Sequence, residues 1–329
     1  MNQHGRSKSA DFMHTVEMES VPCPLGCESG DTHVLTGRDL LHDLPGLFDV
    51  VRCRGCGLMR TSPRPTARSI CAYYPADYGP YKGTRVESLH QNRNSTKARL
   101  VAAARKIFNT KAHALPAVPV GRMLEIGCAS GSFLHEMAAK GWQVEGIEFS
   151  PEAAAAARAL GHKVETGAVE SIEKPAANYD LIVGWMVLEH LHEPTASLKK
   201  LHGWSKPGGW LAVSVPDAGA LEFSVFRHRW YGLQLPTHLF HFNVNSIRRV
   251  LEQSGWELVS IHRHRSVANL VASSGYWVRD KISMNVGEKL IRYPEGAGRV
   301  GALLTFLPGL VLGALGQTGR MTVWARRKP

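Results

Sequence analysis

The chain has 329 residues, of which 44% are hydrophobic and 20% charged, and this balance excludes a disordered or fibrous protein. Its formal net charge is +11, and the basic excess lies on the two flanks of a more acidic segment, residues 121–215. Six cysteines are too few at this length for a disulfide-rich secreted scaffold. Residues 1–20 are polar and lack the apolar centre of a secretory signal, so we predict a disordered tail and a cytoplasmic protein.

Two cysteine pairs near the start of the chain have the spacing of metal ligands. The first pair has the pattern C-x3-C and the second C-x2-C. The four residues are Cys23, Cys27, Cys53 and Cys56. Four thiolates suit a closed tetrahedral zinc site, whose ion is structural because no position stays open for a substrate. The first pair is one residue longer than the usual C-x2-C, so His33 or His42 could replace a ligand.

The cysteine pairs predict a zinc-ribbon-like module over residues 21–80. Between the pairs, residues 38–40 and 48–52 have the pattern of short strands. A helical linker over residues 81–120 follows, with a basic amphipathic helix expected at 95–108. The module therefore precedes a larger domain.

A glycine-containing turn between an expected strand and an expected helix marks the start of that domain. Residues 123–133 read as an apolar strand, a small-residue turn with Gly127 and Gly131, and the first turn of a helix. The next apolar strand, 144–148, ends in a second carboxylate, Glu148. In a parallel α/β sheet these two features lie side by side at the carboxyl ends of the strands, where such folds bind ligands. Glycines let a ligand approach the backbone, and the acid can bind both hydroxyls of a ribose.

The glycine spacing distinguishes two nucleotide-type ligands. The dinucleotide fingerprint has glycines at relative positions 0, 2 and 5, whereas here they fall at 0 and 4. Glu125, two residues before Gly127, would repel a pyrophosphate but suits the ammonium group of an amino-acid-bearing sulfonium. The pattern E-x-G-x-x-x-G resembles the first motif of class I S-adenosylmethionine-dependent methyltransferases.

Later segments follow the order of the same family. They include an "LEH" motif at residues 188–190, which resembles the motif after the family's fourth strand. The expected helices and strands are 151–160, 162–165, 179–183, 210–215, 244–254 and 256–264. The resemblance implies a Rossmann-like α/β core over residues 121–329, with a seven-stranded, mostly parallel sheet whose last strand is antiparallel.

The resemblance also implies which residues bind the cofactor. They lie on the glycine turn, at the end of the second strand and on the loops that follow the third and fourth strands. These residues are Glu125, Gly127, Cys128, Ala129, Gly131, Phe133, Glu148, Phe149, Ala168, Val169 and Trp185.

An uncharged run near the end of the chain, residues 300–316, is at the short limit for a membrane span. A strand is expected after it at 320–326, and in the family this strand pairs antiparallel beside the preceding one. The segment between them, about 266–318, then leaves the sheet and returns to it on the same side. It therefore cannot be a single membrane span. We expect a packed helical insertion, a lid, or a peripheral contact with the inner face of the membrane.

Methyl transfer to an oxygen needs the acceptor proton removed, and histidine is a natural base. His190 ends the "LEH" motif, whereas His238 and His241 follow the fifth strand, on a loop that commonly faces the substrate in the family. We predict His238 as the base, with His190 and His241 as alternatives. Each could instead be a hydrogen-bonded structural histidine.

The predicted function is O-methylation of a sugar, or of a nucleotide- or lipid-linked glycan precursor. A ribbon ahead of such a core resembles bacterial methyltransferases associated with sugars and glycans. An alternative acceptor is a quinone or another lipid-soluble small molecule, suggested by residues 300–316. A zinc-ribbon nucleic-acid-binding protein is a rival of another class, but the scattered basic residues argue against nucleic acid as a partner. Intact Glu125, Gly127, Gly131 and Glu148 argue against a non-catalytic scaffold.

Overall fold

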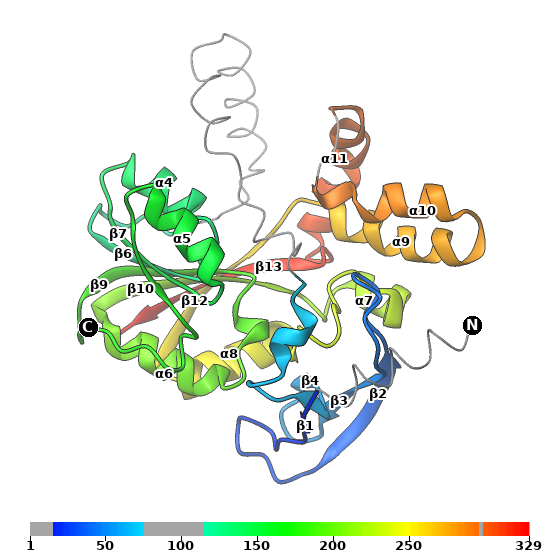
Figure 1. The fold of residues 1–329 in the computed structure, drawn as a ribbon, viewed down its shortest axis with the longest axis horizontal. Helices are drawn as coiled ribbons and strands as arrows, with labels where there is room; N and C mark the ends of the chain where they lie inside the picture. The colour runs from blue at the N-terminus through cyan, green and yellow to red at the C-terminus, as the bar shows by residue number, and fades with distance from the viewer. Residues whose placement is uncertain (1–15, 76–114, 296–298, 329) are drawn as a thin grey trace.

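The computed structural model describes residues 16–75, 115–295 and 299–328 (Figure 1). The basic helix expected at 95–108 and most of the expected linker lie outside the described residues. Within them, a seven-stranded sheet and a four-stranded sheet are connected through one shared hydrophobic core, and a third sheet has two short strands.

The larger sheet has seven strands. In spatial order they are β12 (Trp256–Arg263), β13 (Arg320–Arg327), β10 (Ser205–Pro216), β9 (Tyr179–Trp185), β6 (Arg122–Ile126), β7 (Gln143–Glu148) and β8 (Lys163–Thr166). The last strand, β13, is antiparallel to both of its neighbours, and the strands from β10 to β8 are parallel. This topology confirms the predicted class I methyltransferase fold. The chain leaves β6 toward β7 on one side and reaches β9 on the other, so the carboxyl end of β6 is the position where such sheets bind ligands.

Helices cover both faces of this sheet (Figure 1). They are α4 (Ser132–Ala138), α5 (Pro151–Ala159), α6 (Pro194–Trp204) and α8 (Val244–Gln253). Local sequence sets their ends. The Ser150 hydroxyl accepts the N–H of Ala153 at 3.2 Å and caps α5, while Asn243 and Ser246 form a reciprocal capping box on α8.

The N-terminal part forms a smaller sheet with the order β11-β4-β3-β2. Its strands are β2 (Asp31–Gly37), β3 (Phe48–Cys53), β4 (Met59–Thr61) and β11 (Phe240–His241). The strand expected at 38–40 was wrong, because the chain turns there. The Asp39 carboxylate accepts the backbone N–H groups of Leu41, His42 and Leu44 at 2.9–3.2 Å, which holds a turn instead of a strand.

The end of the expected disordered tail also differs from the structure. Residues 18–19 form strand β1 (Met18–Glu19), which pairs antiparallel with β5 (Arg64–Pro65), and Val16 is buried. A short 3-10 helix, η1 (Ile70–Tyr73), follows β5. The folded part therefore includes residues 16–20.

The smaller sheet is joined to the methyltransferase core by β11, which comes from the loop after β10 and pairs with β4. Two side chains strengthen the contact. The Thr61 hydroxyl donates to the carbonyl oxygen of His238 at 2.8 Å, and buried Arg64 donates to the carbonyl oxygen of His192 at 2.9 Å. The pairing of β11 with β4 and these two bonds therefore hold the two sheets against each other.

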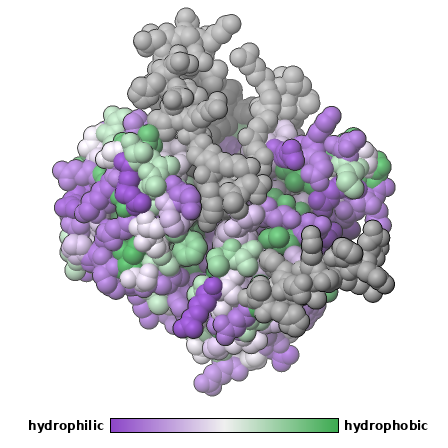
Figure 2. All heavy atoms as spheres, in the orientation of Figure 1, coloured by the Kyte–Doolittle hydropathy of each residue, from purple (hydrophilic) through white to green (hydrophobic). Residues whose placement is uncertain are grey.

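The segment between β12 and β13 is helical. It contains α9 (Ala268–Lys281), α10 (Met284–Ile291), η5 (Tyr293–Glu295) and α11 (Arg299–Ala314), and these helices project from the sheet in Figure 1. Within the described part of the chain, no helix is both long and apolar enough to cross a membrane. Leu307 and Leu315 on and just after α11 are nevertheless 67% and 66% exposed. On the face shown in Figure 2, most side chains are hydrophilic and the hydrophobic ones lie in small groups.

The remaining short elements lie in the loops that follow β9 and β10. They are η3 (Leu188–His190), α7 (Leu221–Phe226) and η4 (Arg227–Arg229). The "LEH" motif is therefore a single 3-10 turn at the carboxyl end of β9.

Candidate active site

The glycine turn lies between β6 and α4, where the predicted cofactor site begins. Gly127 has φ +63° and Gly131 φ +81°, and Ala129 between them has φ +46°. A Cβ on Gly127 would collide with the Val187 side chain, and one on Gly131 would lie 2.8 Å from Ala157 Cβ. Both glycines are thus required by backbone conformation and by close packing at the carboxyl end of β6.

Glu148 ends β7 beside this turn and is buried. Its carboxylate accepts the backbone N–H of Ala129 and of Ser150, each at 2.8 Å. Burial raises its pKa, and these two N–H groups oppose that effect. Each oxygen keeps a further lone pair, so Glu148 can hold the turn and still accept the hydroxyls of a ribose.

Glu125 lies on β6, 3% exposed, and its Oε2 atom has no hydrogen-bond partner among the described residues. Burial and the nearby charge of Glu148 raise its pKa well above the ordinary value. A buried carboxylate oxygen without a partner is costly unless a donor reaches it. The orphaned atom beside the glycine turn fits a cofactor that carries an ammonium group, as S-adenosylmethionine does.

The other predicted cofactor residues surround the turn at different depths. The ring of Phe133 on α4 meets Trp185 at the end of β9 edge to face, with centroids 5.3 Å apart. Phe149 is 47% exposed directly after Glu148. Ala168 is half-buried on the loop after β8, whereas Val169 belongs to the main core.

The Cys128 side chain points away from the turn into the core. A Cβ on Gly146 would lie 2.6 Å from its sulfur, so the thiol packs beneath β7. Burial raises the pKa of this thiol, and the charges of Glu125 and Glu148 add to the effect. Of Cys128, only the backbone is positioned to meet a ligand on the turn.

Two of the three candidate bases lie together. The rings of His190 and His238 meet edge to face with centroids 4.6 Å apart. His190 Nδ1 is 2.9 Å from the carbonyl oxygen of Thr237 and 2.9 Å from the Tyr74 hydroxyl. His238 Nδ1 is 2.9 Å from the carbonyl oxygen of Gly232. A carbonyl oxygen only accepts, so in each ring Nδ1 carries the proton and donates it to the carbonyl oxygen. Nε2 is then the basic nitrogen.

Burial sets the charge of these histidines. It lowers the pKa of His190 to about 4, and it lowers the pKa of His238 well below the ordinary value, with the neighbouring His190 adding to the effect. Both rings are therefore neutral at pH 7, the form that accepts a proton.

His241 has a different environment. It lies on β11, where its Nε2 is 3.2 Å from the Thr61 hydroxyl of β4. Burial lowers the pKa of His241 to about 3. These contacts make His241 part of the junction between the two sheets.

Two groups beside the histidines were not identified from the sequence. Glu189 is fully buried, and neither of its carboxylate oxygens has a hydrogen-bond partner among the described residues. Burial raises the pKa of Glu189 to about 8, against the opposing effects of its own backbone N–H and the charge of Arg320. Tyr74 reaches His190 from the N-terminal module. The acid of the "LEH" motif was a visible signal for Glu189, but no local pattern pointed to the contact of Tyr74.

The cofactor turn and this cluster are adjacent. Val187, which packs against Gly127, directly precedes the 3-10 turn that carries Glu189 and His190. The loop with His238 is fixed to the same turn, because the N–H of Leu239 donates to the carbonyl oxygen of Glu189 at 2.8 Å. Groups that could remove a proton thus lie beside the predicted position of the cofactor.

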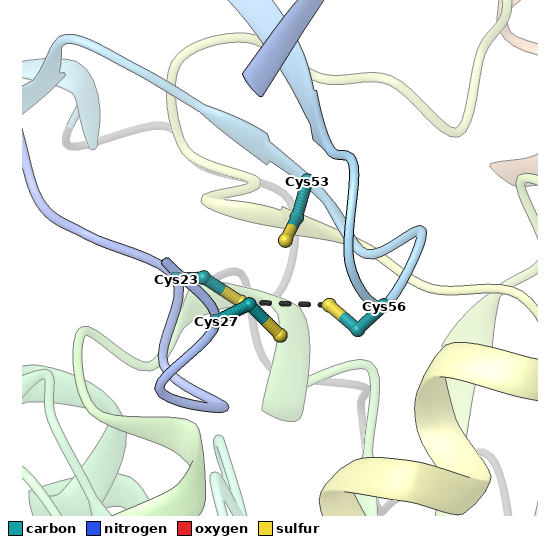
Figure 3. Close-up of side chains that lie close together, drawn as sticks. All are labelled: Cys23, Cys27, Cys53 and Cys56. Atoms are coloured by element: carbon teal, nitrogen blue, oxygen red, sulfur yellow. Dashed lines mark hydrogen bonds between the residues drawn. The ribbon is translucent and has the colours of Figure 1, made fainter. Parts of the chain in front are cut away.

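The four predicted zinc ligands also come together. Figure 3 shows the sulfur atoms of the two cysteine pairs gathered between two loops. All four ligand atoms lie within 4.8 Å of one another, and the sulfurs of Cys23 and Cys56 are 3.4 Å apart. His33 lies outside this cluster and contacts the Thr36 hydroxyl at 3.0 Å. The longer C-x3-C loop therefore still brings Cys23 into the cluster.

The two cysteines of the second pair differ in their surroundings. Burial opposes ionisation of Cys53, but hydrogen bonds from the N–H groups of Cys56 and Gly55 and from the thiols of Cys56 and Cys23 together lower the pKa of Cys53 to about 7. Burial raises the pKa of Cys56. Four converging thiols with amide donors around them fit a tetrahedral zinc ion.

Comparison with known proteins gives the family. The methyltransferase domain family matches residues 89–261, which is more than half of the chain. The chain belongs to this family. The match covers the glycine turn, both carboxylates, the "LEH" turn and the loop with His238.

Curated relatives of this methyltransferase-domain protein include ubiquinone biosynthesis O-methyltransferases. The protein of that name from Xanthomonas axonopodis pv. citri (strain 306) is 32% identical over 136 residues, which are 38% of this chain and 56% of the relative. The one from Burkholderia pseudomallei (strain 1710b) is 28% identical over 159 residues, 44% of this chain and 68% of the relative. The chain spans about half the length of the first curated relatives it matches.

Solved structures with a similar arrangement include an S-adenosylmethionine-dependent methyltransferase from Mesorhizobium loti, with a TM-score of 0.43 and 16% identity over 71% of this chain and 99% of that one. Another is phospholethanolamine N-methyltransferase 2 from Haemonchus contortus, with a TM-score of 0.44 and 17% identity over 70% of this chain and 52% of that one.

Proposed function

We propose that the protein transfers a methyl group from S-adenosylmethionine to a hydroxyl oxygen of a small molecule. The cofactor supplies an activated methyl group on sulfur. The protein binds it through the glycine turn, Glu125 and Glu148, and the cluster of Glu189, His190 and His238 takes up the acceptor proton. One observation carries the proposal: half-buried His190 and buried His238, each held through Nδ1 by a backbone carbonyl, lie on loops next to Val187, which packs against Gly127 of the cofactor turn.

These groups act mainly by position and by excluding water. A displacement at carbon needs the acceptor oxygen aligned with the methyl group, and holding both reactants supplies much of the rate enhancement. We expect the buried side chain of His238 to limit the access of bulk water to the acceptor. The lowered pKa of both histidines keeps them in the neutral, proton-accepting form at neutral pH.

For the acceptor, we favour a hydroxyl on a lipid-soluble ring, of the phenol or quinol class. The curated relatives are named for ubiquinone biosynthesis and support this class. Exposed apolar side chains on the helices between β12 and β13 also suit contact with a lipid phase, in which such an acceptor dissolves. These side chains are Trp277, Ile282, Met284, Leu307 and Leu315.

A sugar or glycan precursor is the second candidate. It is supported by a hollow of about 300 Å³ beside β2, whose lining includes Arg38, His228 and Arg229. Basic groups there suit the phosphate of a nucleotide- or lipid-linked sugar, although Arg229 is paired with Asp280 at 2.9 Å.

The cysteine cluster supports structural zinc as part of the same proposal. Its residues share a hydrophobic core with β11 and with the helices of the methyltransferase sheet. A zinc ion there would hold the N-terminal module, including Tyr74, against the acceptor side.

Replacing His238 tests the proposal. We expect His238→Ala to lower turnover by roughly 10²- to 10⁴-fold, as for loss of an acid–base group, and to leave S-adenosylmethionine affinity unchanged. Turnover is measured by mass spectrometry with a catechol-type acceptor and, separately, with a nucleotide-linked sugar. His202→Ala is the control, since His202 packs on Trp256 outside the site. Normal turnover of His238→Ala would contradict the role of the cluster, and the productive acceptor decides between the two candidates.

A further inference from the structure

We propose that Glu189, His190 and His238 bind a divalent transition-metal ion, for which zinc is the best fit. This second metal centre is distinct from the four-cysteine cluster. It deepens the proposed function by assigning the proton chemistry to a metal site, and in that respect it rests on that function.

The isolation of Glu189 is the first observation. Its carboxylate is fully buried, yet no described residue donates a hydrogen bond to either oxygen. Arg320 attracts it electrostatically, but the Arg320 Nε donates to the Ser214 hydroxyl at 3.1 Å. Buried carboxylates in proteins are paired or coordinate metals, because an isolated one loses its hydration without compensation.

The orientation of the two imidazoles is the second observation. Each ring is held through Nδ1 by a backbone carbonyl at 2.9 Å, from Thr237 for His190 and from Gly232 for His238. This arrangement fixes the tautomer that leaves the Nε2 lone pair free to bind. Metal-binding histidines almost always have such a partner on the second ring nitrogen.

The third observation is convergence. One ligand atom from each of Glu189, His190 and His238 lies within 4.8 Å of the other two. Tetrahedral ligands at about 2.0–2.2 Å from a common zinc ion lie about 3.3–3.6 Å apart, so small shifts of these side chains would complete the site around an ion. The three side chains come from two loops that are fixed to each other by the bond from Leu239 N–H to the Glu189 carbonyl oxygen. The set is therefore held in place before an ion arrives.

Two histidines and one carboxylate form the donor set of open catalytic sites. Three protein ligands leave at least one position for a fourth, and the acceptor hydroxyl is the group that must lie there during methyl transfer. A hydroxyl bound to a divalent ion ionises at lower pH. In the metal-bound site the acceptor proton would therefore leave to solvent and not to His190 or His238, whose Nε2 atoms would be ligands.

Cobalt titration of the full-length protein tests the inference, because cobalt replaces zinc and reports its ligands by absorption. We expect the chelator-treated protein to take up about two equivalents, one with a strong thiolate-to-cobalt band and one without it. Glu189→Gln and His238→Gln should each take up about one, with the thiolate band intact. His202→Gln is the matched control and should retain both.

The thiolate band shows that each variant is folded around the cysteines, and calorimetric binding of S-adenosylmethionine shows that the cofactor side is folded. Zinc content of the purified protein by mass spectrometry should fall by one equivalent in the same variants. A wild-type protein that binds cobalt only at the cysteines, or variants that keep the second equivalent, would overturn the inference. Loss of turnover in His238→Gln without a second metal in the wild type would leave the proposed methyl transfer standing and remove the metal centre. If the wild type binds two metal ions but no S-adenosylmethionine, the metal centre stands and the proposed methyl transfer is contradicted.

Discussion

The cofactor side and the acceptor side of the candidate site are built in different ways. The cofactor side comes mainly from one continuous stretch, β6 to β8, with Trp185 added from β9, and relies on glycine conformations, backbone amides and two carboxylates. The acceptor side combines Tyr74, the turn with Glu189 and His190, and the loop with His238. The first can form from local sequence, whereas the second exists only when the N-terminal module is packed against the core.

Removing a cysteine ligand should break the acceptor side and spare the cofactor side. We expect Cys53→Ser to lose zinc, a structural ion worth about 10 kcal/mol or more in small metal-dependent domains. Hydrogen exchange should then accelerate in β4, β11 and residues 237–241, with little change in β6 and β7. Cys71→Ser is the control, because Cys71 is exposed and outside the cluster. If hydrogen exchange in Cys53→Ser changed equally on the acceptor side and the cofactor side, the acceptor side would not depend on the N-terminal module more than the cofactor side does.

Replacing Glu148 should affect the cofactor side alone. We expect Glu148→Ala to weaken S-adenosylmethionine binding by about 2–3 kcal/mol, because a charged acceptor is lost. Calorimetry measures this, and metal content should not change. Glu136→Ala on the exposed face of α4 is the control for charge. Unchanged affinity in Glu148→Ala would refute its role at the ribose.

Substitutions of two glycines, Gly131 and Gly161, test whether packing as well as backbone conformation constrains the glycine turn. Gly131 and Gly161 both have positive φ, but only Gly131 has a close neighbour at its Cβ position. Gly161→Ala should cost about 1–2 kcal/mol in stability from backbone strain. Gly131→Ala should cost about 1–3 kcal/mol more, because of the contact with Ala157. Thermal unfolding compares them, and equal losses would mean that packing does not constrain the turn.

The same contrast explains what the sequence could predict. The strands, the glycine turn and Glu148 follow from apolar patterns and turn residues within short windows, and the structure contains each of them. The four cysteines carried their own spacing signal, and they converge as expected. The antiparallel β13 followed only from the family resemblance.

Contacts between distant segments were not predictable in this way. The pairing of β4 with β11, the bond from Tyr74 to His190 and the isolation of Glu189 depend on how two sheets meet, which no local pattern encodes. The misplaced strand at 38–40 has a local cause, since Asp39 favours a turn by accepting three backbone N–H groups.

Calorimetric titration of the full-length protein with S-adenosylmethionine and, separately, with NAD tests the central claim most directly. The geometry of Glu125, the glycine turn and Glu148 predicts saturable one-to-one binding of S-adenosylmethionine and no binding of NAD. Binding of NAD in its place would contradict the interpretation of the turn and of the site built around it.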